Sequence, residues 1–295
     1  MVHNSSAASA STHWDRMYDN GTRSAWTQNS LVTQALYRRM TGKPGYWLEW
    51  LFKEGMPRVD RLLSVGCGDG SHEISIARRG FAAHTVAFDA SPRAIEIASE
   101  TAAAEGLPVD FSVRLFEDFT ANPGPEASFD AVLFAGSLHH VTDLEGMLAA
   151  VRRVVRPGGW VIVNEYVGPC YQLYPQSQVD IVNRVLSSIP QTFRMHPDER
   201  LVLPSIEAIM ASDPTEGVRA AIIPTLLPLY FRAEHLSPMA GGLLHPLFGY
   251  LNGDRINDES PESQSLTRML ITMEDELTRA GVLQHDFMFG IYRRD

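Results

Sequence analysis

The sequence predicts a doubly wound α/β fold, in which helices cover both faces of a mostly parallel sheet. Strand and helix patterns alternate four times, with short connections, between residues 61 and 166, and this alternation is typical of a parallel sheet. Apolar runs such as residues 62–65 fit strands buried on both faces. Two more strand patterns follow late in the chain. We therefore expect a seven-stranded sheet with helical insertions that form a cap.

The first half of the chain gives the elements in order. We expect helix from residue 13 to 51, broken at 42–45 by Gly-Lys-Pro-Gly. Strands are expected at 62–65, 84–88, 109–113, 129–134 and 160–164. Ser91-Pro92 predicts a helix start, because serine favours the N-cap and proline the first helical position. A helix at 144–155 should stop at Arg-Pro-Gly-Gly, residues 156–159.

The second half is expected to be mainly helical. Helices are predicted at 178–186, 206–211, 216–227 and 263–280, strands at 230–235 and 287–292, and a loop or helix start at 239–248. The pattern predicts three parts. Residues 1–50 form an N-terminal helical cap segment, 51–168 form the ligand-binding core, and 169–295 combine helical cap insertions with the last two strands.

Composition narrows the possible partners. The chain has 25 Lys and Arg against 35 Asp and Glu, a net charge of -10, which argues against a general nucleic-acid binder. Two cysteines, Cys67 and Cys170, make no disulfide framework and fit a reducing cytoplasm. The longest apolar region, 218–231, contains an arginine and two prolines and is too short to span a membrane. We expect a cytoplasmic protein, with homo-oligomer formation left open.

A glycine turn after the first strand is the main ligand-binding motif. Gly66, Gly68 and Gly70 alternate between strand and helix, an arrangement that binds nucleotide-like ligands at a helix N-terminus. A dinucleotide fingerprint is G-x-G-x-x-G, but Ser71 stands where its last glycine would be. Asp89 follows Gly70 by nineteen residues, close to the spacing of an acid that accepts hydrogen bonds from ribose hydroxyls.

Two segments carry a family resemblance. The glycine turn with Asp69 resembles motif I of the class I S-adenosylmethionine (SAM)-dependent methyltransferases, and FDAVLFAGSLHHV, residues 129–141, resembles their segment after strand four. The family's Asn/Asp-Pro-Pro-Tyr element is absent here, which argues against methylation of bases or amides. Glu-Tyr-Val-Gly-Pro at 165–169, with Gly-Gly and leucines at 241–244, resembles a bacterial small-molecule group. The resemblance implies a Rossmann-like core, SAM as cofactor and S-adenosylhomocysteine as product.

The same resemblance implies which residues bind the cofactor, all near carboxyl ends of strands. Asp118 would accept from the adenine amino group and Phe119 would pack on the ring; alternatively, Asp118 is a loop or cap residue. The full set is Gly66, Cys67, Gly68, Asp69, Gly70, Asp89, Ala90, Asp118, Phe119 and Ala135.

The candidate catalytic residues follow strands four and five. His140 suits a general base, or packs under the cofactor and bonds backbone. Glu165, at the end of a buried strand, either binds substrate, acts as base or pairs structurally, because an unpaired buried charge is costly. His139 and Tyr166 complete the set. No metal is expected, since adjacent histidines cannot share one ion as an i, i+4 helical pair does.

Other side chains are weaker candidates. Tyr166 and Trp26 face the sulphonium through cation–π contact or, alternatively, pack in the core. His245 is a cap candidate. The apolar cap residues suggest a partly hydrophobic acceptor, although such residues also pack on one another; they are Leu243, Leu244, Leu247, Phe248 and Tyr250.

Our leading hypothesis is an SAM-dependent methyltransferase that methylates a hydroxyl oxygen of a small-molecule acceptor. Transfer to carbon or nitrogen of a natural-product or isoprenoid-like substrate is the nearest alternative. An NAD(P)-dependent oxidoreductase is a third reading, which Ser71 and the Asp118-Phe119 pair count against. A protein that binds SAM without transferring its methyl group is a fourth.

Overall fold

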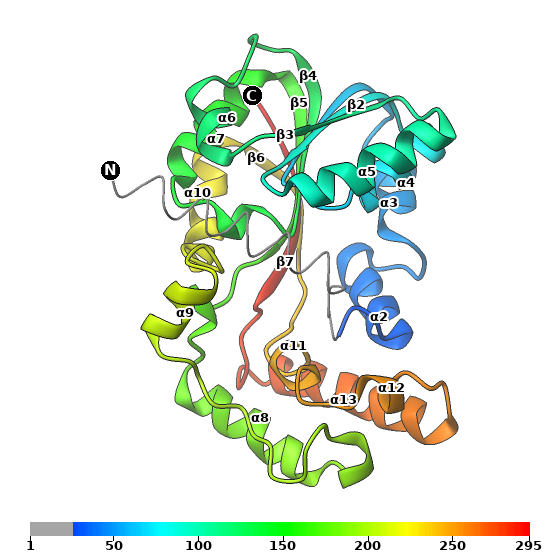
Figure 1. Ribbon diagram of the computed structural model, residues 1–295, viewed down its shortest axis with the longest axis vertical. Coiled ribbons are helices and arrows are strands. Elements are labelled where there is room, and N and C mark those ends of the chain that lie inside the picture. The colour runs from blue at the N-terminus through cyan, green and yellow to red at the C-terminus, as the bar shows by residue number, and fades with distance from the viewer. Residues whose placement is uncertain (1–25) are drawn as a thin grey trace.

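A seven-stranded sheet runs through the centre of the protein (Figure 1). The computed structural model describes residues 26–295, so the first part of the predicted N-terminal helix lies outside the described residues. The strand order is β3-β2-β1-β4-β5-β7-β6; β7 is antiparallel to both its neighbours and the first five strands are parallel. The strands are β1 (Val59–Val65), β2 (Ala82–Asp89), β3 (Val109–Val113), β4 (Phe129–Ala135), β5 (Val155–Tyr166), β6 (Arg232–Pro238) and β7 (Phe287–Arg293).

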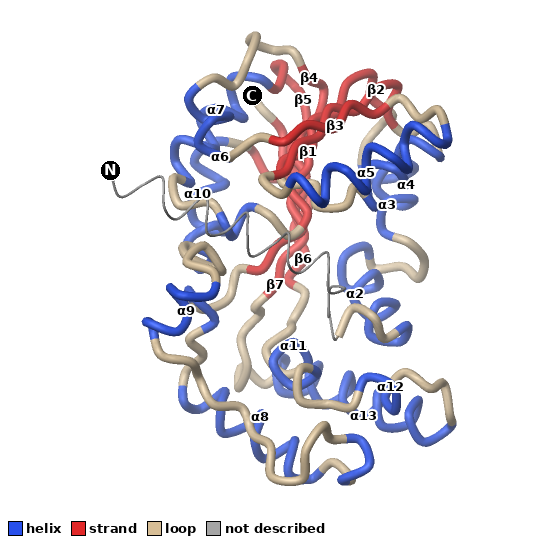
Figure 2. The backbone as a smooth tube through the Cα atoms, in the orientation of Figure 1, coloured by secondary structure: helices blue, strands red, loops and turns tan. Residues whose placement is uncertain are grey.

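Helices cover both faces of this sheet, as Figure 2 shows. On one side lie α4 (Ser71–Arg78) and α5 (Pro92–Glu105); on the other lie α6 (Phe116–Ala121), α7 (Leu144–Val154) and α10 (Ile223–Tyr230). Side chains of strand β4 point alternately into the two apolar layers. Ala131 and Leu133 belong to one buried cluster, Val132 and Phe134 to the other. A strand buried on both faces is largely apolar along its length. Asp130 is the exception in β4, and its Oδ2 accepts from the N–H groups of Asp60 and Arg61 in β1.

The cap shares one of these apolar layers with the sheet. Its helices are α2 (Ser30–Thr41), α3 (Trp47–Trp50), α8 (Gln176–Ser188), α9 (Ile206–Ser212), α11 (Leu244–Phe248), α12 (Gly253–Ile256) and α13 (Pro261–Arg279). Leu247 and Leu270 of the cap are fully buried in the same cluster as Leu133 of β4. The Arg39 guanidinium joins α2 to the Glu274 carboxylate of α13 at 2.7 Å.

The predicted fold class is confirmed, and most elements lie where the sequence placed them. Strand β3 has the predicted bounds, and Ser91 Oγ caps α5 by accepting from the Ala94 N–H at 3.1 Å. The predicted helix at 216–227 is wrong in its first half, because Gly217 has φ +62° and α10 begins only at Ile223. Helix α6 has no counterpart among the predicted elements.

Strand β5 also differs from its prediction, since it begins at Val155 and includes the predicted turn. A register shift opposite Phe129 and Ala131 lets the strand pass Pro157, which cannot donate to a ladder. A Cβ at Gly159 would lie 2.9 Å from the Asp130 carbonyl oxygen. The proline and glycines therefore make a bulge rather than a stop.

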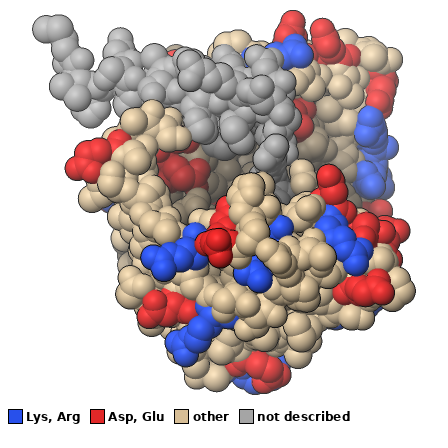
Figure 3. Space-filling model, turned by 60° about the horizontal axis from the view of Figure 1, so that its bottom comes forward, with Lys and Arg blue, Asp and Glu red and all other residues tan. Residues whose placement is uncertain are grey.

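The outer surface carries no long run of one charge on the face that Figure 3 shows, where basic side chains are scattered among acidic ones. Within residues 26–295, no helix has the length and apolar content needed to cross a membrane.

Candidate functional site

The glycine turn joins β1 to α4 and depends on glycine at two points. Gly66, Gly68 and Gly70 have φ of +70°, +55° and +73°. A Cβ on Gly66 would lie 2.5 Å from Ser137 Cβ, and one on Gly70 would lie 2.6 Å from the Phe111 ring. Only glycine combines this backbone conformation with such close approach.

Asp89, at the end of β2, holds the turn from the neighbouring strand. Its Oδ2 accepts from the Gly68 N–H at 2.9 Å, and its Oδ1 accepts from the Ser91 N–H at 2.9 Å. A carboxylate has about four acceptor sites. The geometry therefore lets one side chain order the turn and also accept from ligand hydroxyls.

A pocket of about 250 Å³, which we call the glycine pocket, opens at the carboxyl ends of β1, β2 and β4. Several residues predicted to bind cofactor line it: Gly66, Cys67, Gly68, Asp69, Asp89, Ala90 and Ala135. His140 lines it as well. Gly70 does not line the pocket and lies against Phe111 and Ala98 instead. Residues that the sequence did not single out for this role also line it, namely Ser71, His72, Leu115, Phe116, Glu117, Gly136, Ser137 and Thr215.

Asp118 and Phe119 are not brought to this pocket, which corrects the sequence expectation. Helix α6 begins at Phe116 and turns both away. Phe119 is 1% exposed and packs on Phe88 with ring centroids 5.2 Å apart, and Asp118 is exposed in the first helical turn. Leu115, Phe116 and Glu117 line the pocket instead. Leu115 precedes the helix, whereas Phe116 and Glu117 begin it, so another acidic and apolar pair lies two residues before the predicted one.

Glu165 orders the turn that follows β4. Its side chain is fully buried. Its Oε1 accepts from the N–H groups of Ser137 and Leu138 at 2.8 and 2.7 Å, and its Oε2 accepts from His139 Nδ1 at 2.7 Å. Glu165 lines neither the glycine pocket nor the second pocket described below. Of its predicted alternatives, structural pairing is the one that fits this geometry.

Tyr166 and Trp26 are packed among other rings. The Tyr166 hydroxyl donates to the Pro169 carbonyl at 2.7 Å, and burial raises the pKa of Tyr166 far above its usual range. Trp26 is 6% exposed, with its ring centroid 4.8 Å from that of Phe287. Neither side chain lines the glycine pocket, so the core-packing alternative fits both.

A cap segment between α9 and α10 meets His140. Asp213 Oδ1 accepts from the Thr215 hydroxyl at 2.6 Å, and Thr215 Oγ1 lies 3.2 Å from His140 Nδ1. Because the threonine proton goes to Asp213, the threonine oxygen accepts from His140, and Nδ1 of His140 carries the proton. This tautomer, inferred from the hydrogen-bond network, makes Nε2 the acceptor nitrogen.

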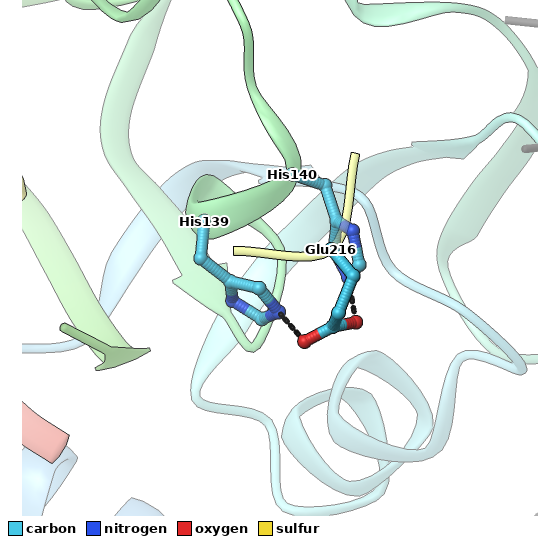
Figure 4. A group of neighbouring side chains, drawn as sticks. All are labelled: His139, His140 and Glu216. Atoms are coloured by element: carbon cyan, nitrogen blue, oxygen red, sulfur yellow. Dashed lines mark ion pairs between the residues drawn. The ribbon is translucent and has the colours of Figure 1, made fainter. Parts of the chain in front are cut away.

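Both adjacent histidines direct Nε2 toward one carboxylate, as Figure 4 shows. Glu216 Oε1 lies 4.0 Å from His139 Nε2, and Oε2 lies 3.7 Å from His140 Nε2. The rings come from a 3-10 turn, Leu138–His140, and their centroids are 4.2 Å apart. The expectation that neighbouring histidines cannot face one point is therefore wrong, because it applied helical geometry to a turn.

The charges in this cluster are strongly coupled. Burial opposes a charge on His139, but the Glu165, Glu216 and Asp213 carboxylates outweigh it and raise its pKa. Burial and the field of His139 lower the pKa of His140. The two histidines lower the pKa of Glu216 despite its burial, helped by Gln172, whose Nε2 donates to Oε1 at 2.6 Å.

A second pocket of about 460 Å³, the cap pocket, lies on the other side of this segment. Asp213 and Glu216 line it, while Thr215 and His140 line the glycine pocket. Within residues 26–295, its remaining wall is largely apolar or aromatic and includes no Lys or Arg: Tyr171, Gln172, Tyr174, Leu201, Val202, Leu203, Pro204, Ala208, Ile209, Ser212, His245, Pro246, Gly249 and Tyr250. The two pockets thus meet at His140 and residues 213–216.

The cap pocket contains only part of the predicted acceptor site. His245 and Tyr250 line it, and the Tyr174 hydroxyl lies 3.1 Å from His245 Nδ1. The other apolar cap candidates are buried in the core instead; they are Leu243, Leu244, Leu247 and Phe248. Asp213, Thr215 and Glu216 were not predicted as site residues, because Glu216 was assigned to the start of a helix and residues 213–215 to no element. The available signal was Asp-Pro-Thr-Glu itself, a turn-type sequence.

Comparison with known proteins agrees with this geometry. Residues 62–159 match the family model described as a methyltransferase domain. The chain is 30% identical over 158 residues to the demethylmenaquinone methyltransferase of Thermus thermophilus, covering 51% of this chain and 70% of that protein. It is 40% identical over 115 residues to the ubiquinone biosynthesis O-methyltransferase of Methylocella silvestris, covering 36% of this chain and less than half, 43%, of that protein.

Among solved structures, the geranyl diphosphate methyltransferase in complex with GPP and sinefungin superposes with a TM-score of 0.51 at 16% identity. The match covers 84% of this chain and 77% of that one, and shows the same fold. With the glycine turn, the strand order and the Thermus relative in agreement, the chain belongs to the class I SAM-dependent methyltransferase family.

Proposed function

We propose that this protein transfers the methyl group of SAM to a hydroxyl oxygen of a small, uncharged, ring-bearing acceptor. The observation that carries the proposal is the meeting of the two pockets at His140 and residues 213–216. A cofactor in one pocket and an acceptor in the other would approach each other there. Holding two reactants in line is the main contribution that a protein can make to such a transfer.

The glycine pocket fits SAM. The absent Cβ atoms of the glycine turn leave room for a ligand against backbone, and Asp89 is placed to accept from both ribose hydroxyls. We assign Glu117 to the adenine amino group and Leu115 and Phe116 to the ring. When bound, SAM supplies a methyl group on a positively charged sulphur, which an acceptor oxygen can attack.

The cap pocket indicates the acceptor class. Its wall combines aromatic and branched side chains with the carboxylates of Asp213 and Glu216. With no Lys or Arg among its described lining residues, it lacks the groups that bind phosphates. An anionic acceptor such as a diphosphate is therefore disfavoured. The names of the relatives, a demethylmenaquinone methyltransferase and a ubiquinone biosynthesis O-methyltransferase, support a quinone-related acceptor, and the second supports transfer to oxygen.

We assign to His140 the removal of the hydroxyl proton. It lines the glycine pocket, its Nδ1 is held by Thr215, and its Nε2 is directed toward the cap pocket residue Glu216. A general base must lie within reach of the proton that it removes. The oxygen of an acceptor between the two pockets would meet this nitrogen.

The direct test is transfer of a labelled methyl group from SAM to acceptors of different charge. We expect neutral hydroxylated aromatic compounds to yield labelled methyl ethers, and their phosphate esters to yield none. Labelled carbon or nitrogen in the product would replace oxygen as the acceptor atom. Tight binding of S-adenosylhomocysteine with no labelled product from neutral or charged acceptors would contradict the proposed transfer.

Replacing Asp89 should weaken cofactor binding. We expect Asp89→Ala to lose about 1.5–3 kcal/mol of binding free energy, since hydrogen bonds to a charged group are worth that much. Calorimetry with S-adenosylhomocysteine measures the loss. Asp110→Ala, an exposed acid on β3 paired with His84 at 2.9 Å, is the matched control and should bind normally. Unchanged affinity in Asp89→Ala would remove Asp89 from the cofactor site.

A further inference from the structure

We propose that His139 Nε2, His140 Nε2 and the Glu216 carboxylate bind one divalent transition-metal ion at the junction of the two pockets. The proposal deepens the proposed function, because the ion would lie where the acceptor oxygen meets the methyl group. The three ligand atoms lie within 4.8 Å of one another (Figure 4).

The three converging ligand atoms are all hydrogen-bond acceptors. Nδ1 of His139 donates to Glu165, and Nδ1 of His140 donates to Thr215. In the neutral rings, both Nε2 atoms therefore present lone pairs to Glu216, whose carboxylate also only accepts. Something positive has to lie between them, either protons or a cation.

The distances between the histidine nitrogens and the Glu216 oxygens are too long for hydrogen bonds. The separations of 4.0 and 3.7 Å exceed the 2.7–2.9 Å of a hydrogen bond between charged groups. Ligands at about 2.0–2.2 Å from a tetrahedral metal ion lie roughly 3.3–3.6 Å apart. The observed separations, each to a different oxygen of Glu216, exceed the metal-ligand spacing by less than they exceed a hydrogen bond. A proton on His139 alone would leave the lone pair of His140 Nε2 facing the carboxylate at 3.7 Å, whereas one metal ion would satisfy both nitrogens.

Neighbouring side chains hold each of the three proposed ligands in position. Histidines that bind metal usually donate their other ring N–H to a carboxylate or similar acceptor, as His139 does to Glu165. Asp213 acts on His140 through Thr215. Gln172 holds Glu216 Oε1 at 2.6 Å. Thus each ligand has a partner that fixes its direction.

Ligand type indicates which ions fit. Two imidazoles and one carboxylate with open positions suit Zn²⁺, Fe²⁺ or Co²⁺, whereas Mg²⁺ prefers oxygen ligands. Both pockets reach this cluster. The open positions would therefore be accessible to an acceptor oxygen.

The ion would change how the acceptor hydroxyl loses its proton. A hydroxyl bound to it becomes more acidic, and its proton leaves to solvent through the cap pocket, which Glu216 lines. The oxygen then forms a bond to the methyl carbon while the carbon–sulphur bond breaks and leaves its electron pair on sulphur. With the ion bound, His140 is a ligand; without it, His140 takes the proton itself.

Metal binding by the untagged, full-length chain tests the site directly. After removal of metal with a chelator, we expect one equivalent of Zn²⁺ to bind, and Co²⁺ to give the visible absorption of a nitrogen- and oxygen-ligated ion. Glu165→Gln and Thr215→Val should weaken metal binding by about 10- to 100-fold. His139→Ala and Glu216→Gln should weaken it further.

Matched measurements separate this site from the rest of the protein. His84→Ala removes an exposed histidine that also pairs with a carboxylate, and should bind metal like the parent chain. Binding of S-adenosylhomocysteine shows that each variant is folded. Absence of stoichiometric Zn²⁺ and Co²⁺ binding, or binding unchanged in both His139→Ala and Glu216→Gln, overturns the metal site. Methyl transfer that persists after metal removal would keep the proposed function and return the proton to His140.

Discussion

Glu165→Ala should lower the free energy of unfolding by about 3–5 kcal/mol, the cost typical of removing one partner from a buried ion pair. The Glu165 side chain is fully buried and accepts hydrogen bonds from Ser137, Leu138 and His139. Alanine would leave these three donors buried without their acceptor. The turn that places both histidines would lose its support, so activity should fall with stability.

Glu165→Gln separates stability from function. The amide oxygen can still accept from the two backbone N–H groups, so the expected loss of stability is only about 1–2 kcal/mol. The amide nitrogen, however, would face Nδ1 of His139, donor against donor. His139 must then take the other tautomer and place a proton on the nitrogen directed at Glu216. We therefore expect a near-native unfolding midpoint with much slower methyl transfer.

Denaturant unfolding and initial rates measure the two effects on the same samples. Glu96→Ala, at an exposed position of α5 paired with Arg93, is the control and should change neither quantity. A Glu165→Ala variant as stable as the parent would show that the turn does not depend on this carboxylate. A fully active Glu165→Gln variant would show that the His139 tautomer does not matter.

The cofactor half of the site was accessible from sequence because strands and glycines are local signals. Gly66, Asp89 and Ala135 each follow a predicted strand, and parallel strands bring their carboxyl ends to one edge. The identity of the residues that we assign to the adenine was not accessible in this way. It depends on whether a helix starts at Phe116 or later, and a shift of two residues exchanges the pocket face for the core face.

The residues that we assign to the acceptor site could not be predicted, because they meet only through tertiary packing. Glu216 is 77 residues from His139, and nothing local in either segment specifies their contact. The sequence placed Glu216 on a helix, whereas Gly217 at φ +62° ends a turn that directs the carboxylate inward. The apolar residues after Gly242 were assigned to the acceptor site for a related reason. Hydrophobicity predicts that a side chain is buried, but not whether it faces the core or a pocket.

A buried acid below the glycine turn provides the second large expected effect. Glu73 of α4 is 1% exposed; its Oε1 accepts from Ser64 Oγ at 2.5 Å, and its Oε2 has no hydrogen-bond partner within residues 26–295. Burial raises the pKa of Glu73 to about 7, opposed by the Ser64 hydroxyl and reinforced by Asp69 and Asp89. The folded protein therefore holds this proton more tightly than the unfolded chain does.

The raised pKa of Glu73 makes the folded protein less stable as the pH rises. Below pH 4.5, Glu73 is protonated in both states; as the pH rises from there to about 7, only the unfolded chain loses the proton, so stability falls. Glu73→Gln keeps the shape of the protonated acid without this dependence. Relative to the parent, we expect the variant to gain about 2–3 kcal/mol between pH 5 and pH 8. Denaturant unfolding at the two pH values measures the gain, with Glu100→Gln, at an exposed position of α5, as the control. An equal difference between variant and parent at both pH values would mean that Glu73 ionises normally in the folded protein.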